Sequence, residues 1–180
     1  GKSIIMEQIS KEISKKSDNI IYLNFEDKKI SSNIRTTDML IEYVEENRKD
    51  GKCYLFFDEI QELEDWQEAC KTLRLYDNSI FITGSNSKLL SGEFTKELSG
   101  RFVSFRIRPF VYKEILEYAA ELGKEVSVSD YLVWGGFPKR FEFESGPAQE
   151  RYLNDLDDTI VINDLIKPYN IKKVSLFKSL

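Results

Sequence analysis

Short apolar runs alternate with helix-like patterns over the first 123 residues of the chain. Apolar runs bounded by acids, glycines or a proline predict strands at residues 19–25, 53–60, 79–85 and 101–108. The second of these, CYLFFDEI, is almost continuously apolar until its two acids, as in a strand that is covered on both faces. These runs predict a buried sheet.

Helical patterns lie between the predicted strands. Ile5, Ile9 and Ile13 recur every four residues and predict the apolar stripe of a helix that begins near Ser3. Asp65 is a candidate N-cap for a helix that follows the second strand. Further helical patterns cover residues 36–51, 65–76 and 111–123. Because strand and helix alternate, we expect an α/β fold with a largely parallel sheet.

The pattern changes after Gly123. The next stretch holds a Gly-Gly turn and two prolines, and it leads into a predicted helix from about Ala148 to Ile166 and another near Lys172. We therefore expect a boundary near residue 124, followed by the start of a mostly helical C-terminal domain. The two predicted parts are residues 1–123 and 124–180.

Composition narrows the class of protein. The chain has 180 residues, 41% of them hydrophobic, with a formal net charge of -5 and a sequence pI near 5.0. These values favour a soluble globular protein and argue against nucleic-acid binding over the whole surface. No apolar run approaches a membrane span and no signal-peptide pattern opens the chain, so we expect a cytoplasmic protein without membrane partners.

Cysteine and histidine usage excludes several chemistries. Cys53 and Cys70 lack the C-x-x-C spacing of a zinc site and are expected to be reduced thiols in the core. The chain has no histidine, which removes Ser-His-Asp and Cys-His catalysis.

Phosphate-binding chemistry is indicated at the start of the chain. Gly1, Lys2 and Ser3 match the second half of a phosphate-binding loop, G-x-x-x-x-G-K-[ST], just before a helix. Asp58 and Glu59 follow a buried strand, and ligands bind beyond the carboxyl ends of parallel strands. Asp58 is thus a candidate for the water shell of a Mg²⁺ ion and Glu59 for orienting or deprotonating a water, with two solvated acids as the alternative. On an extended strand end, the two side chains are expected to point to opposite sides.

Small polar residues follow the next strand. Thr83, Ser85 and Asn86 are candidates for a hydrogen bond to a γ-phosphate or to the attacking water, with Ser85 ahead of Asn86. An ordinary turn is the alternative, because glycine, serine and asparagine are common there. Arg101 is either a finger that reaches the γ-phosphate of a neighbouring subunit or an exposed arginine paired with an acid.

These motifs together resemble the bacterial and archaeal AAA-superfamily P-loop ATPases that carry a C-terminal domain of unknown function. The resemblance is carried by the G-K-S helix, DEIQ with a tryptophan-containing helix, TGS, LSGR and GGFP, and it covers nearly the whole chain. It implies ATP and Mg²⁺ as ligands and hydrolysis of ATP to ADP and phosphate. The residues implied are Lys2 and Ser3 for the phosphates and the metal, Asp58 for the metal, and Glu59, Ser85 and Arg101 for catalysis, and the motifs themselves add Gly1 and Asn86 as nucleotide contacts.

The resemblance also implies a doubly wound parallel sheet of the P-loop ATPase type, with five strands. Its central strand would precede the phosphate-binding loop and lie between the strands predicted at residues 79–85 and 101–108. That strand and the first half of the loop are missing here. We therefore expect the 180 residues to be a fragment of a longer protein, inactive and weak in ATP binding by itself.

Other functions remain open to different degrees. A nucleotide-dependent switch or partner-binding module would keep the same pocket with little turnover, whereas the absence of D-x-x-G and N-K-x-D patterns disfavours a GTPase. Association with DNA has thin support from a few cations. A nuclease site on the helix predicted from about Ala148 to Ile166 is disfavoured because Asp157 and Asp158 face different sides of it. The cations are Arg106, Arg108, Lys139 and Arg140, and the acids are Asp155, Asp157, Asp158 and Asp164.

Overall fold

The computed structural model describes residues 1–84, 102–144 and 146–166. By contacts the chain divides into two compact units, Gly1–Phe105 and Arg106–Leu180. These units are defined by contacts within the structure, and the domain boundary expected near residue 124 stays a prediction.

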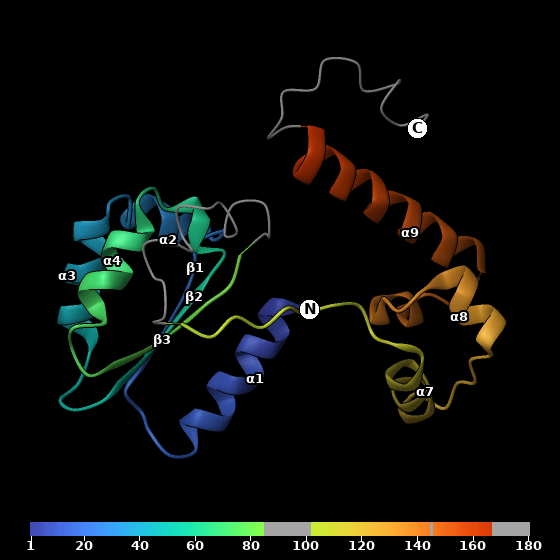
Figure 1. Ribbon diagram of the computed structural model, residues 1–180, viewed down its shortest axis with the longest axis horizontal. Coiled ribbons are helices and arrows are strands. Elements are labelled where there is room, and N and C mark those ends of the chain that lie inside the picture. Colours follow the sequence, from blue (N-terminus) through green and yellow to red (C-terminus); the bar gives the residue numbers. More distant parts are fainter. Residues whose placement is uncertain (85–101, 145, 167–180) are drawn as a thin grey trace. The chain divides into compact units, whose positions relative to one another are not determined.

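The first unit is built on a parallel sheet. Its strands are β1 (Ile20–Asn24), β2 (Cys53–Asp58) and β3 (Asn78–Ile82), in the spatial order β1-β2-β3 (Figure 1). Tyr22 lies opposite Phe56 on β2, and Phe56 lies opposite Phe81 on β3. The carboxyl ends of all three strands therefore lie at one edge of the sheet, which confirms the predicted parallel α/β arrangement.

Helices cover both faces of this sheet. The chain order of the helical elements is α1 (Lys2–Ser14), α2 (Lys28–Asn33), α3 (Thr37–Asn47), the 3-10 turn η1 (Ile60–Glu62) and α4 (Trp66–Leu73). In Figure 1, α3 and α4 lie on one side of the sheet and α1 on the other. Parallel strands need such crossover helices, and the layers follow from that connectivity.

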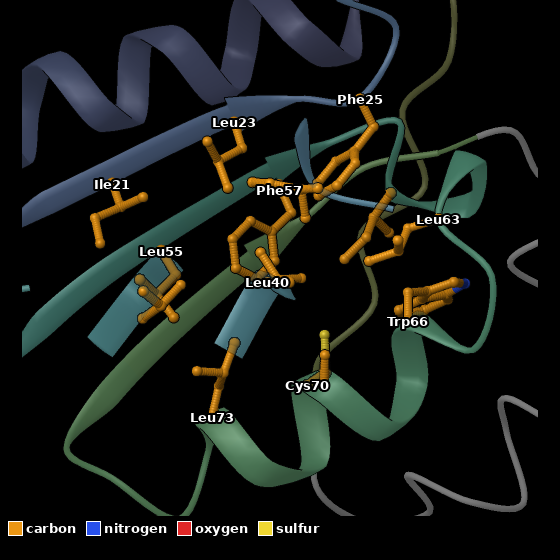
Figure 2. Packing of buried hydrophobic residues seen from close by; sticks show 14 of the residues in the cluster. Ile21, Leu23, Phe25, Leu40, Leu55, Phe57, Leu63, Trp66, Cys70 and Leu73 are labelled. Carbon is orange, nitrogen blue, oxygen red and sulfur yellow. The ribbon is translucent and has the colours of Figure 1, made fainter. Parts of the chain in front are cut away.

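The core lies between the sheet and helices α3 and α4 (Figure 2). Alternate strand positions such as Leu23, Leu55 and Phe57 point to this side and pack against Leu40 of α3 and Leu73 of α4. Both cysteines belong to the same cluster as free thiols, as predicted. Burial raises the pKa of the Cys70 thiol to about 12, so this thiol is protonated at neutral pH.

The opposite face of the sheet carries a row of aromatic rings. Tyr22 and Phe56 stack at 5.8 Å between ring centroids, and Phe56 and Phe81 stack at 4.6 Å. This row lies on the side of α1, whose buried residue is Met6. The predicted stripe was therefore wrong in phase, because Ile5 and Ile9 are 36% and 37% exposed while Met6 is 3% exposed.

Two further sequence predictions need correction. Residues 102–108 form no strand, because a strand needs a hydrogen-bonded neighbour and no described residue pairs with this segment. Val103 and Phe105 are accordingly 78% and 80% exposed. Asp65 occupies the N-cap position of α4 but makes no capping hydrogen bond from its side chain, since its backbone is left-handed (φ 52°).

The second unit is helical where the structure describes it. Its elements are α7 (Tyr112–Glu121), α8 (Val128–Trp134), the 3-10 segment η2 (Pro138–Glu142), α9 (Gly146–Ile160) and the π-helical turn η3 (Val161–Ile166). Ile115, Ala119, Val126 and Phe141 form its core. The helix predicted near Lys172 lies outside the described residues.

The Gly-Gly pair of the second unit has a packing role. Gly135 ends α8 with a positive φ of 67°, and the carbonyl oxygen of Gly136 accepts a hydrogen bond from Phe110 N at 2.9 Å. A Cβ at Gly136 would lie 1.8 Å from the carbonyl oxygen of Phe110. Only glycine fits at this close approach of two backbone segments.

Candidate nucleotide site

The first turn of α1 begins at the candidate site. The carbonyl oxygen of Gly1 accepts a hydrogen bond from Ile5 N at 3.2 Å, so Lys2 and Ser3 are held in helical geometry. Lys2 Nζ donates to the carbonyl oxygen of Gly84, just beyond β3, at 2.6 Å. The residues predicted from the loop motif thus lie beside the carboxyl end of the sheet.

Asp58 is the centre of a hydrogen-bond cluster. It ends β2 and is 1% exposed. Its Oδ1 accepts hydrogen bonds from Ser3 Oγ at 3.2 Å and from Thr83 Oγ1, and its Oδ2 accepts one from Tyr22 OH at 3.5 Å. The cluster therefore joins α1, β1, β2 and the residue after β3 at one carboxylate.

Glu59 departs from the geometry expected of it. Its backbone is left-handed (φ 52°, ψ 44°), so β2 has already ended and the alternation of strand side chains does not apply. Glu59 N donates to Thr83 Oγ1 at 3.2 Å, and Glu59 Oε2 accepts a hydrogen bond from Gln61 Nε2. A left-handed non-glycine residue stores strain of order 1–3 kcal/mol, and such residues cluster at functional sites.

Tyr22 is a contact that sequence reasoning missed. Burial, with the negative charge of Asp58 as the second cause, raises the pKa of its phenol to about 12. The phenol thus remains a hydrogen-bond donor to Asp58 at physiological pH. The sequence did show a tyrosine near the end of the strand that pairs with β2. Which side chain of that strand faces Asp58 depends on the strand register, and the sequence does not give the register.

Other predicted residues are not brought to this cluster by the described structure. Ser85, Asn86 and Arg101 lie outside the described residues. Arg140, one of the cations considered for DNA, is 3% exposed, and a solvent-facing basic patch cannot include it. Asp155, Asp157 and Asp158 are exposed on α9.

The donor set at Asp58 fits a magnesium ion. Within the described ranges, no group of three or more acidic, histidine or cysteine side chains gathers in one place. Mg²⁺ bound with a nucleotide does not need such a group, because phosphates and waters supply most of its ligands. One hydroxyl and one carboxylate, from Ser3 and Asp58, match the protein's usual share.

Comparison with known proteins agrees with this geometry. A family model described as AAA domain matches residues 1–116. The chain belongs to the AAA domain family. The AAA domain is a nucleotide-binding domain of the P-loop NTPase class, and its match spans α1, the sheet and the first half of α7.

Two curated relatives are similar over almost the whole chain. An uncharacterized protein of Haemophilus influenzae is 34% identical over 190 residues, covering 99% of this chain and 47% of the relative. An uncharacterized protein of Methanocaldococcus jannaschii is 32% identical over 198 residues, covering 100% of this chain and 43% of the relative. The chain therefore spans less than half the length of these relatives. No solved structure matched the chain.

Among the described residues of this AAA domain protein, no helix combines the length and apolar character needed to cross a bilayer.

The Thr83 hydroxyl is expected to stabilise the site itself. Thr83→Val keeps the side-chain shape but removes the donor to Asp58 and the acceptor for Glu59 N. We expect the free energy of unfolding of the chain to fall by about 1–3 kcal/mol, because the buried carboxylate of Asp58 and the partly buried amide of Glu59 each lose a partner. Urea denaturation measures this loss. Thr83→Ser, which keeps the hydroxyl, is the matched control, and equal stability of the two variants would contradict the role.

Proposed function

We propose that this AAA domain binds ATP and hydrolyses it to ADP and phosphate. The observation that carries the proposal is the meeting of Ser3 and Thr83 at the buried carboxylate of Asp58, beside Lys2 and Glu59. An ATPase needs a cation for the phosphates, oxygen ligands for a metal and a carboxylate for the water. All three kinds of group lie at one edge of the sheet.

Each residue has a proposed role. Lys2 leaves the Gly84 carbonyl and binds the β- and γ-phosphates, and Ser3 and Asp58 hold Mg²⁺. The Mg²⁺ ion supplies positive charge that offsets the charge of the phosphates. Glu59 orients the attacking water and accepts its proton, while Thr83 fixes the backbone amide of Glu59.

Three proposed roles rest on the sequence alone, because their residues lie outside the described part of the structure. Ser85 hydrogen-bonds the γ-phosphate or the attacking water, Asn86 contacts a phosphate, and Arg101 acts as an arginine finger. A finger in this position implies a homo-oligomer in which one subunit completes the site of the next. A cytoplasmic location is likewise a prediction from the sequence.

Nucleotide binding by the full-length protein tests the proposal. Lys2→Ala is expected to weaken ATP binding about tenfold or more, since a charge-assisted contact to the phosphates is lost. Calorimetric titration with ATP and Mg²⁺ measures the affinity. Lys11→Ala removes an exposed lysine on the same helix and is expected to bind normally. If Lys2→Ala binds ATP as tightly as the parent protein, ATP is not bound at this site and the proposal is contradicted.

Asp58→Asn separates metal binding from phosphate binding. Its ATP affinity is expected to lose most of its dependence on Mg²⁺, because the carboxylate that would hold the ion becomes neutral. The measurement compares titrations with Mg²⁺ and with a chelator. An undiminished Mg²⁺ effect would show that the ion is held elsewhere.

A further inference from the structure

A buried arginine in the second unit has no role in the nucleotide site. Arg140 lies in η2, in a turn that begins at Pro138, and is 3% exposed. Its guanidinium carbon lies 4.3 Å from the centroid of the Phe141 ring. Arginine is seldom buried this deeply unless its charge is paired, so its partners decide what the residue does.

The guanidinium is only partly satisfied. Nη1 donates to Gln149 Oε1 at 3.4 Å, whereas Nε and Nη2 are buried and have no hydrogen-bond partner among the residues that the structure describes. The carboxylate that acts electrostatically on Arg140 is that of Asp130. Asp130 is already engaged, because its Oδ2 accepts hydrogen bonds from Ser127 N at 2.9 Å and Ser127 Oγ at 2.6 Å.

The two unpartnered nitrogens form one edge of the guanidinium. Nε–H and Nη2–H point in nearly the same direction, and their spacing matches the two oxygens of a carboxylate. Burial of a guanidinium that lacks part of its hydrogen bonds is unfavourable, and burial lowers the pKa of Arg140. The arrangement thus favours a planar anion that accepts two parallel hydrogen bonds.

Arg140 lines a cavity within the second unit. The cavity has a volume of about 370 Å³, at the lower end of the range for small-ligand pockets. Val126, Trp134 and Phe141 give it apolar and aromatic walls. Glu125 and Asp130 also line it, and their charges oppose a multiply charged anion such as phosphate.

We propose that this cavity binds the carboxylate of a ligand whose remaining part is apolar, and that the Arg140 side chain shifts on binding so that Nε and Nη2, which are buried without a ligand, become paired donors to it. Gln149 positions the guanidinium through Nη1, and Trp134 contacts the apolar part of the ligand. The ligand is either a small free acid or the end of a peptide chain, since both carry the same group. This site is independent of the proposed ATP hydrolysis.

Calorimetric titration of the full chain with acids and their neutral amides tests this site. The small probes are benzoate and benzamide, and the peptide probes are a short peptide ending in phenylalanine, as free acid and as amide. We expect at least one acid to bind and its amide not to bind. The acid that binds identifies the source of the carboxylate. If neither acid binds, or if inorganic phosphate binds as tightly, the proposal is overturned.

Variants of the arginine and its neighbours assign the binding to this cavity. Arg140→Met removes the donors with an apolar chain of similar length and is expected to weaken acid binding about tenfold or more. Lys139→Met removes the adjacent exposed cation and is expected to bind normally. Equal binding by Arg140→Met and Lys139→Met would overturn the assignment.

A second variant decides the question if Arg140→Met does not fold, as judged by circular dichroism. Gln149→Glu places a carboxylate within reach of the guanidinium, where it competes with the ligand. We expect it to lower acid affinity about tenfold while the helical signal is kept. Undiminished affinity would show that the ligand binds elsewhere.

Discussion

Replacing Glu59 by glutamine in the full-length protein is expected to leave ATP binding intact and to lower ATP turnover by about 10²-fold or more. Glutamine keeps the size of the side chain and can still hydrogen-bond Gln61, but it cannot accept a proton from water. Lys2, Ser3 and Asp58, which serve the phosphates and the metal in our proposal, are unchanged. Steady-state phosphate release and equilibrium ATP titration measure the two properties separately.

Glu64→Gln is the matched control for this prediction. Glu64 is an exposed acid a few residues further along the chain, so its neutralisation changes net charge equally without touching Asp58. We expect turnover at the parental rate. If Glu59→Gln also turns over at that rate, in a preparation free of contaminating ATPase, Glu59 is not the catalytic carboxylate. A nucleotide-dependent switch with little turnover then becomes the better proposal.

Replacing Gly136 by alanine is expected to disrupt the second unit, with a loss of about 3 kcal/mol or more in its free energy of unfolding. The added Cβ would meet the backbone of Phe110 at 1.8 Å. That backbone cannot move aside easily, because Phe110 N donates to Gly136 and Phe110 O accepts a hydrogen bond from Tyr131 OH at 3.1 Å. Hydrogen exchange of the α7 amides measures the loss.

Gly146→Ala controls for the change from glycine to alanine. Gly146 begins α9, and a Cβ added there would meet no atom within 4 Å, so alanine is expected to be neutral or slightly stabilising. If Gly136→Ala exchanges its α7 amides as slowly as Gly146→Ala, the close approach of the two segments does not stabilise the unit.

The sequence was most informative where burial and periodicity coincide. The strands β1, β2 and β3 and the helices α1, α3, α4 and α7 were all predicted to within a few residues. Thr36 caps α3 by accepting a hydrogen bond from Met39 N. Helices α2 and α8 were missed because they have six and seven residues, too few to show a period. The Ser127 and Asp130 capping box was the local signal for α8.

The candidate site was predictable in its motif residues but not in its backbone. The meeting of Ser3 with Asp58 follows from a helix that starts where parallel strands end. The left-handed conformation of Glu59 could not be read from the sequence, since non-glycine residues seldom adopt it. The phase of α1 was mistaken because apolar spacing alone selected Ile5 and Ile9, whereas the sheet contacts the side that carries Met6.

The division of the chain into two units also separates its two tryptophans. Trp66 lies in the core of the first unit and is 3% exposed, whereas Trp134 is half-buried at the end of α8 in the second. Each unit therefore has its own intrinsic fluorophore, and the more shielded indole of Trp66 emits at shorter wavelength. A single emission spectrum contains both signals, so the melting of one unit can be distinguished optically from that of the other without an added dye.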